Sequence, residues 1–271
     1  MTASVAGGTL SALEGRMKLF PFMVLLGVLC CSGAHGRELI LYTYHDKPPY
    51  YFHADGSGKN VLGIYTDLAT YLNARQGQYS VRVQLLPRLR LQASLEQGLM
   101  DGGVIGGHPP WFQDKEQTRY LWTAPFMLDM DVVVVQRDRP FAYKHPEDLT
   151  GKRLSLPRGL YFWGVTELIG QGRIDADETS SDIQNLQKVA LGRADATITS
   201  ILTYKHLMKH LFCEDELIYL QLPHDRFDRR IFFPKGREDY YQVINPLLQD
   251  ILECDVWLGV LEKYDYQGEQ D

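Results

Sequence analysis

The sequence predicts an α/β fold of two similar lobes, each a mostly parallel sheet flanked by helices, joined by two extended hinge strands. Three observations support this prediction. Strand and helix patterns alternate through residues 38–107, the same order returns through residues 152–201, and a long extended segment follows each half, at 121–138 and at 217–236. Alternating strands and helices with short linkers form parallel sheets that helices cover.

The first half contains three strands and two helices in alternation. Each expected strand is a short apolar run, and the first expected helix places Ile64, Leu68, Tyr71 and Leu72 on one face. In order, the elements are a strand at 38–45, a helix at 63–74, a strand at 79–87, a helix at 88–99 and a strand at 101–107.

The second half follows a polar connector that contains proline, and it repeats the order of the first. Its elements are a strand at 152–157, a helix at 161–172, a short strand at 173–176, a helix at 182–193 and a strand at 194–201. The extended segment that follows leads to an apolar helical tail at 239–264. We interpret this segment as the return of the chain to the first lobe.

The expected lobes are therefore discontinuous. The first comprises residues 37–135 and 226–271, and the second comprises residues 136–225. Because the chain crosses between them twice, the two crossings form a hinge that can open and close a cleft.

A short pattern occurs once in each half and links a helix to the strand after it. Gly98-x-x-Asp101 precedes one strand of small residues, and Gly192-x-x-Asp195 precedes the other. A glycine in the left-handed conformation ends a helix at little steric cost. We expect both glycines to adopt it.

Composition and charge restrict the classes of partner. The chain is 45% hydrophobic and 23% charged, which is typical of a soluble globular protein. The net charge of -6 arises from acidic and basic residues that alternate along the chain, which argues against nucleic acid as a partner. A monomer without a cofactor is expected.

The N-terminal residues 1–36 are interpreted as a cleaved signal peptide. Met17 and Lys18 lead into an apolar run and then a small-residue exit, so residues 1–16 would be an upstream extension from a mis-assigned start. A transmembrane anchor is the alternative, but the run is shorter than the roughly 20 residues that span a bilayer. The expected location is the periplasm.

Cysteine and histidine patterns give little support for a metal site. The mature chain would keep Cys213 and Cys254, which in an oxidising compartment form either one disulfide or two separate thiols. His206 and His210 have helical spacing, but they are interpreted as a solvated helix face because no further ligands accompany them.

Several short motifs follow one another along the whole mature chain. They are Pro49-Tyr50-x-Phe52, Gly63-x-x-x-Asp67-Leu68, Trp122-Thr123-Ala124-Pro125-Phe126, Asp148-Leu149-x-Gly151-Lys152, Gly192-Arg193-x-Asp195-Ala196 and Pro234-Lys235-Gly236. In this order and spacing the chain resembles the bacterial extracellular solute-binding proteins of family 3. The resemblance implies the type II periplasmic binding fold and service to an amino-acid ABC importer.

The ligand clamp of that family is altered here. A Thr-x-Thr-x-x-Arg run binds the α-carboxylate in amino-acid binders, and residues 108–113 replace it with His-Pro-Pro-Trp-Phe-Gln. Leu160 stands where a threonine is expected, and Ser200 stands where an acidic residue would pair with the α-amino group. An ordinary free α-amino acid is therefore not the expected ligand.

Aromatic residues occupy the expected strand ends instead, where open parallel sheets bind ligands. They are Tyr44, Tyr50, Tyr51, Trp111, Phe112, Tyr161 and Phe162. Flat aromatic faces favour rings, sugars or cations. The candidate ligand-binding residues are Tyr50, Trp111, His108, Arg90, Arg158, Tyr161, Ser200 and Thr199. Local packing is the alternative role for Tyr50, and a salt bridge is the alternative for Arg90.

The expected function is that of a periplasmic solute-binding protein that closes around a small polar or aromatic solute for an ABC-type permease. One alternative is a ligand-sensing or interaction module that feeds an envelope sensor. Another is an enzyme similar to the periplasmic dehydratases, which needs a carboxylic acid or a lysine in the cleft. The stretches 107–113, 157–163 and 197–200 contain His108 but no such group, so they favour a protein without catalytic activity.

Overall fold

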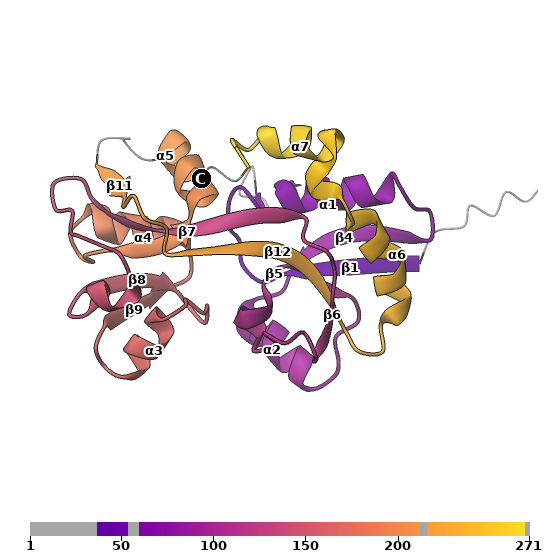
Figure 1. The fold of residues 1–271 in the computed structure, drawn as a ribbon, viewed down its shortest axis with the longest axis horizontal. Helices are drawn as coiled ribbons and strands as arrows, with labels where there is room; N and C mark the ends of the chain where they lie inside the picture. The colour runs from indigo at the N-terminus through magenta and orange to yellow at the C-terminus, as the bar shows by residue number, and fades with distance from the viewer. Residues whose placement is uncertain (1–36, 54–59, 212–215, 269–271) are drawn as a thin grey trace, which may run out of the picture. The chain divides into compact units, whose positions relative to one another are not determined.

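Two long antiparallel strands, β7 (Met127–Gln136) and β12 (Asp225–Pro234), join two groups of elements, the first and second lobes (Figure 1). We call β7 and β12 the connecting strands. The computed structural model describes residues 37–53, 60–211 and 216–268, so the expected signal peptide lies outside the described residues. Within the described residues, no helix is both long enough and apolar enough to cross a membrane.

The first lobe is built on a parallel sheet. Its strands are β1 (Arg37–Thr43), β4 (Tyr79–Leu85) and β5 (Gly103–Gly107), with β1 between the other two. The antiparallel β12 extends this sheet beyond β5, and the short β6 (Tyr120–Trp122) pairs with β12. A small hairpin consists of β2 (Phe52–His53) and β3 (Val61–Leu62).

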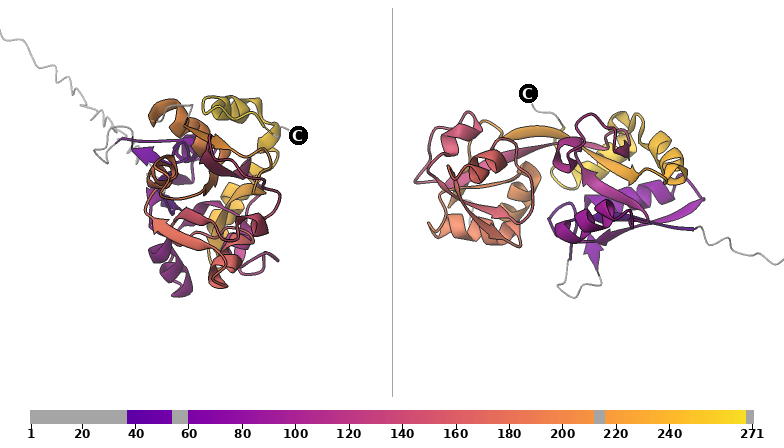
Figure 2. Two further views of the ribbon diagram at one scale, coloured as in Figure 1. Left: turned by 90° about the vertical axis from the view of Figure 1, so that its left-hand side faces the viewer. Right: turned by 90° about the horizontal axis from the view of Figure 1, so that it is seen from below.

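Helices from both ends of the described chain cover this sheet. They are α1 (Ile64–Asn73), α2 (Arg88–Glu96), α6 (Glu238–Leu248) and α7 (Asp255–Glu262), with the 3-10 turns η1 (Pro109–Phe112) and η3 (Ile251–Glu253). Trp257 and Leu261 of α7 share one buried apolar cluster with Leu68 of α1. The C-terminal helices therefore pack beside the N-terminal elements, as the yellow and indigo ribbons show in Figures 1 and 2.

The second lobe has the same kind of core. Strand β8 (Arg153–Pro157) is parallel to β9 (Asp175–Thr179), and β10 (Thr197–Ser200) and β11 (Leu217–Tyr219) pair antiparallel with β7. Its helices are α3 (Val165–Gly170), α4 (Asp182–Ala190) and α5 (Ile201–Leu211), and the 3-10 turn η2 (Pro146–Leu149) precedes β8. The two-lobed α/β fold expected from the sequence is therefore present.

The four consecutive valines of β7 have a clear structural reason. Val133 and Val135 belong to one apolar cluster of the second lobe, and Val132 and Val134 belong to another. Successive side chains of a strand point to opposite faces, so both faces of β7 are buried here. A strand buried on both faces reads as a continuous apolar run rather than as an alternation.

The repeated glycine pattern ends two helices in the same way. Gly98 and Gly192 have φ angles of 67° and 68°. In each case the residue after the glycine donates its backbone N–H to a carbonyl five residues earlier, from Leu99 to Ser94 (2.9 Å) and from Arg193 to Lys188 (2.8 Å). The expectation that both glycines adopt the left-handed conformation is confirmed.

The structure also differs from the sequence expectation in several details. Helix α5 and the β2–β3 hairpin were not expected, and the bounds of two other elements differ. Helix α3 begins at Val165, four residues after the expected start at 161. Gly164 has a left-handed φ of 69° and lies close to the Pro146 ring, so the helix does not extend through it. Strand β9 occupies 175–179 rather than 173–176. Cys254 is a free thiol that accepts a hydrogen bond from the Tyr71 hydroxyl, while Cys213 lies outside the described residues.

Candidate functional site

A small cavity, which we call the interlobe cavity, lies where the two lobes meet beside the connecting strands. Its volume is about 30 Å³. The first lobe contributes Tyr44, His45, Lys47, Arg88 and Trp111, the connecting strands contribute Asp131 and Arg229, and the second lobe contributes Leu160, Tyr161 and Phe162. Most of these residues lie within about five residues after the ends of β1, β4, β5 or β8, at the edge where parallel sheets bind ligands.

Arg88 enters the cavity from the first residue of α2. Its Nη2 donates a hydrogen bond to the Trp111 carbonyl (2.7 Å), and its guanidinium lies 4.0 Å from the centroid of the Phe112 ring. Burial lowers the pKa of Arg88. The Nε atom is buried without an acceptor, and the described residues place no carboxylate in an ion pair with this guanidinium.

His45 lies beside Arg88 and is held neutral. Burial lowers its pKa well below the ordinary value, and the nearby Lys47, Arg229 and Arg88 cations lower the pKa further. Its Nδ1 is buried without a hydrogen-bond partner. The two residues that carry these unsatisfied polar atoms therefore line one cavity.

Lys47 is buried and pairs with the second lobe. Its Nζ lies 3.8 Å from Oδ1 of Asp182, which also accepts a hydrogen bond from the Thr199 hydroxyl (2.6 Å). A buried ammonium and carboxylate in this arrangement offset much of each other's desolvation cost.

Asp131 brings a buried carboxyl group from β7 to the cavity. Burial raises its pKa to about 7, although the Lys47 ammonium acts in the opposite direction. No hydrogen bond within the described residues stabilises the ionised form. Near neutral pH this group therefore exists in both protonation states.

Arg229 organises a buried network on the connecting strands. Asp129 Oδ2 accepts hydrogen bonds from Arg229 Nε (2.7 Å) and from the Tyr50 hydroxyl (2.6 Å). Arg229 Nη1 also donates to the Tyr65 hydroxyl (3.2 Å) and to the Gly106 carbonyl (3.3 Å). The guanidinium also lies over the Tyr50 ring at 4.2 Å, and the Asp129 carboxylate compensates its charge inside the protein.

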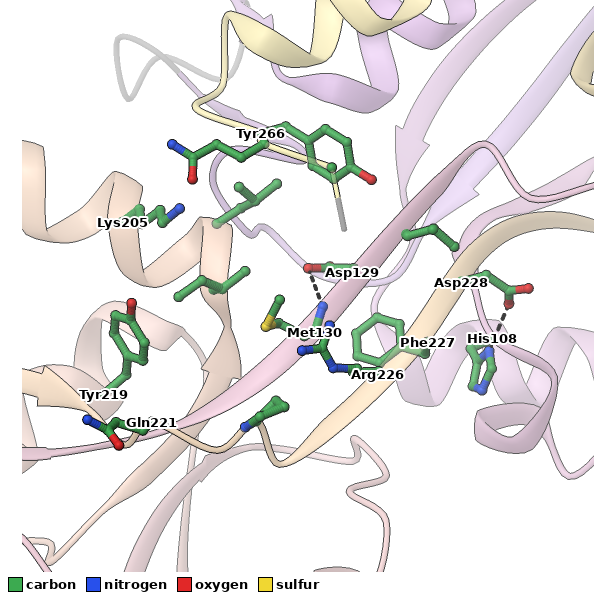
Figure 3. A pocket seen from close by; sticks show the side chains of 16 residues that line it. His108, Asp129, Met130, Lys205, Tyr219, Gln221, Arg226, Phe227, Asp228 and Tyr266 are labelled. Atoms are coloured by element: carbon green, nitrogen blue, oxygen red, sulfur yellow. Dashed lines mark hydrogen bonds and ion pairs between the residues drawn. The ribbon is translucent and has the colours of Figure 1, made fainter. Parts of the chain in front are cut away.

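A larger cavity, the outer cavity, has a volume of about 570 Å³ (Figure 3). Figure 3 shows Lys205, Tyr219 and Tyr266 around it, together with Met130 and Arg226 of the connecting strands. Met130 and Arg226 are paired across the ladder and alternate with the pair of Asp131 and Asp225. Their side chains therefore point to the face of the connecting strands opposite that of Asp131.

Solved structures with the same fold place these observations in a known architecture. No protein-family model and no curated protein sequence matches the chain. A mutant of ArgBP from T. maritima is 21% identical with a TM-score of 0.69, over 85% of this chain and 96% of that one. The fold is that of the type II periplasmic binding proteins.

Two other structures with this fold differ in described role. A histidine kinase sensor domain with similarity to periplasmic binding proteins is 17% identical with a TM-score of 0.69, covering 85% of this chain and 96% of its own. An ancestral amino acid-binding protein, described as a precursor of cyclohexadienyl dehydratase, is 19% identical with a TM-score of 0.64, covering 84% and 95%. At these identities the comparison establishes the periplasmic binding fold and not the solute.

Within this periplasmic binding fold, three of the residues singled out from the sequence line a cavity. Trp111 and Tyr161 line the interlobe cavity, and the Tyr161 hydroxyl donates to Glu167 (3.0 Å). His108 lines the outer cavity, where its Nδ1 lies 3.0 Å from Asp228. Burial acts to raise the pKa of Asp228, but hydrogen bonds from His108 and Arg230 bring it down to about 2.

Of the other five residues, four contact protein groups. Tyr50 is part of the Arg229 network, and Thr199 donates to Asp182. Ser200 donates its hydroxyl to Thr203 (2.9 Å). The two remaining residues, Arg90 and Arg158, are exposed, and Arg158 lies 3.5 Å from Glu178.

Sequence reasoning missed the charged groups of the interlobe cavity. The three stretches considered contain no aspartate or lysine, but Asp131 and Lys47 line the interlobe cavity. Both lie outside the three stretches considered, Asp131 within a connecting strand and Lys47 in the loop after β1. The sequence analysis named Arg90 as a candidate, but Arg88 lines the cavity. Positions 88 and 90 lie about 200° apart around a helix, so their side chains point to different sides.

Proposed function

We propose that this protein is a periplasmic solute-binding protein that closes around a small polar or aromatic solute and delivers it to an inner-membrane ABC permease. One observation carries the proposal. A single cavity is lined by the first lobe, the second lobe and the connecting strands, and it combines aromatic rings with buried ionisable groups. Such a combination of apolar walls and a few polar groups is typical of small-molecule sites.

The size of the cavity supports a closed state. A volume of about 30 Å³ holds roughly one or two water molecules, whereas small-molecule sites have volumes of about 300–1,000 Å³. The solute therefore enters when the lobes separate, with the connecting strands acting as the hinge. We propose residues 37–135 and 226–271 as one moving body and residues 136–225 as the other.

The test is a ligand screen on the protein without residues 1–36. Amino acids, polyamines, aromatic acids and small sugars are added separately, and thermal unfolding is followed. A true solute at a hundredfold excess over its Kd adds about 2.7 kcal/mol to the free energy of unfolding. Small-angle scattering with and without that solute then reports closure. If no compound class shifts the transition, the binding function is wrong.

A second candidate function is a dehydratase-like enzyme on the same fold. It is favoured by Asp131, a buried carboxyl group whose pKa of about 7 suits a general acid. The solutes found in the screen are incubated with the protein, and their consumption is measured. Turnover that Asp131→Asn abolishes would support the enzyme, and recovery of unchanged solute would support the binding protein.

A sensor input is the third reading, since a sensor domain shares the fold. In that case the solute-bound protein would associate with a receptor rather than with a permease. Pull-down from inner membranes with and without the solute separates these partners. The monomeric state is tested in the same preparation by light scattering.

A further inference from the structure

Arg88 is a partly buried cation whose Nε atom is fully buried, and it lacks a carboxylate partner within the described residues. The other two cations of the interlobe cavity are paired, Arg229 with Asp129 at 2.7 Å and Lys47 with Asp182 at 3.8 Å. Among the described residues, the partners of the Arg88 side chain are the Trp111 carbonyl and aromatic faces. Burying a guanidinium without an opposite charge is costly, so an anion at this position would stabilise the closed protein.

Two unsatisfied atoms mark where that anion would bind. Nε of Arg88 and Nδ1 of His45 are both buried without partners, and both residues line the interlobe cavity. A neutral imidazole can donate through Nδ1 if the proton resides there. Together the guanidinium and the imidazole offer donors to the two oxygens of one carboxylate.

We propose that the solute is a carboxylic acid and that Arg88 and His45 bind its carboxylate. The proposal rests on the function proposed above and specifies the chemical class of the solute. The proposal places the carboxylate-binding arginine at the start of α2. In the family of solute-binding proteins that the chain resembles, this arginine belongs to the run after β5, and residues 108–113 of this chain contain no arginine.

The charge of the cavity favours a carboxylate over a phosphate. A phosphate at neutral pH carries a charge of about −1.5 to −2 and three acceptor oxygens, and the cavity offers one unpaired cation. Asp131 lines the same cavity and would repel a dianion when it is ionised. A monoanion with two oxygens matches the single guanidinium better.

The second lobe covers this position when the lobes are closed. A Cβ on Gly159 would lie 3.7 Å from Cγ of Arg88 and from Cδ2 of Leu89, so the glycine backbone rests on the stem of the arginine. Closure therefore removes water from the guanidinium. A charge-assisted hydrogen bond is stronger in such a site than in water.

The experiment compares carboxylates with their primary amides. The probes are benzoate and phenylacetate with the matching amides, and putrescine and glucose serve as cationic and neutral probes. Binding to the protein without residues 1–36 is measured by calorimetry. We expect a carboxylate to bind about a hundredfold more tightly than its amide, because the amide cannot form charge-assisted bonds to the guanidinium.

Arg88→Met and Arg90→Met form the matched pair of variants. Methionine keeps part of the apolar stem, and the Arg90 side chain is exposed on another side of the same helix. Arg88→Met should weaken carboxylate binding about a hundredfold and Arg90→Met less than about twofold. Arg88→Lys, which keeps the charge but loses the fork, should weaken it about tenfold and remains informative if the methionine variant does not fold.

Each outcome has a defined meaning. Binding of an amide, putrescine or glucose with no loss in Arg88→Met overturns the carboxylate clamp and leaves the binding function intact. Equal losses in Arg88→Met and Arg90→Met overturn the role of Arg88. If no probe binds, in this set or in the wider screen, the binding function fails and the clamp fails with it.

Discussion

The ends of β5 and β10 occupy matching places in the two lobes, but they contact their neighbours differently. The end of β5 consists of glycines that leave space for neighbouring groups, whereas the end of β10 has side chains that form hydrogen bonds. Both strands follow a Gly-x-x-Asp turn with equivalent glycine geometry. The first then has Gly102, Gly103, Gly106 and Gly107, whereas the second has Ala196 and a run of hydroxyl side chains.

In the first lobe, aromatic side chains pack directly against the backbone of β5. A Cβ on Gly103 would lie 2.6 Å from a carbon of the Phe233 ring, and one on Gly106 would lie 2.0 Å from the Tyr65 hydroxyl. The Gly106 carbonyl also accepts a hydrogen bond from Tyr44 (3.0 Å). The glycines therefore make room for bulky neighbours.

In the second lobe, the strand binds polar neighbours through its own side chains. Thr199 donates to Asp182, Ser200 donates to Thr203, and Asp131 is the ladder partner of Ser200. The same local sequence pattern thus sets the backbone turn in both lobes. The neighbours decide whether space or hydrogen bonds are required after it.

The largest expected effect comes from adding a methyl group to the first strand. Gly102 corresponds to Ala196 in the repeat, but it has a φ of 131°, and its Cβ would lie 2.3 Å from the Ile40 carbonyl oxygen. We expect Gly102→Ala to lower the free energy of unfolding by about 4 kcal/mol. Urea denaturation measures it.

The reverse change in the second lobe is the control. Ala196→Gly should lower the free energy of unfolding by about 1 kcal/mol, because it increases the backbone entropy of the unfolded chain and removes one buried methyl group. Similar losses of unfolding free energy for the two substitutions would show that the backbone before β5 is no more tightly packed than that before β10.

A smaller effect is expected from Asp131 as the pH changes. Its folded pKa of about 7 exceeds the unfolded value of about 3.9, so the folded protein retains a proton that the unfolded chain releases. This stability is present below about pH 4 and is lost as the pH rises through 7. Between about pH 5 and pH 8, the wild type should lose about 2 kcal/mol relative to Asp131→Asn.

The difference between the two profiles isolates Asp131. Burial lowers the pKa of His224 to about 4 and also lowers that of His45, so both lose stabilising free energy in the opposite direction, as the pH falls. These histidines affect the wild type and the variant alike. Parallel profiles would mean that the Asp131 carboxyl has an ordinary pKa and that the middle of β7 is well solvated.

The smallest effects should be equal in the two lobes. Gly98 and Gly192 have matching left-handed φ angles, and a Cβ on Gly98 would meet no atom while one on Gly192 would come no closer than 3.8 Å. Gly98→Ala and Gly192→Ala should each cost about 1 kcal/mol through backbone strain alone, and the double variant should cost the sum. Thermal unfolding of the three variants checks this. Unequal costs would end the analogy between the two turns.

Most of the architecture could be predicted because it depends on local patterns. Short apolar runs predicted most strands of both lobes, and the glycines at 98 and 192 predicted where two helices end. Helix α3 was overestimated because its apolar residues continue before Val165, while Gly164 prevents the helix from extending there.

The site was much less predictable, and α2 illustrates the reason. Arg88 and Arg90 stand on either side of Leu89, and the helix contains leucine at both 89 and 91. Only Leu91 is buried, while Leu89 is 64% exposed. The sequence does not distinguish these two leucines, so it does not determine which arginine faces the cavity.

The sequence by itself determined the alternation of strands and helices within each half, the two long extended segments and the turns at Gly98 and Gly192, because periodicity and glycine conformation act over a few residues. Only the tertiary structure decided which charges meet. Lys47, Arg88 and Asp131 are far apart along the chain, and their effect on one another depends on distance and burial in space. That convergence leaves Arg88 without a carboxylate among the described residues.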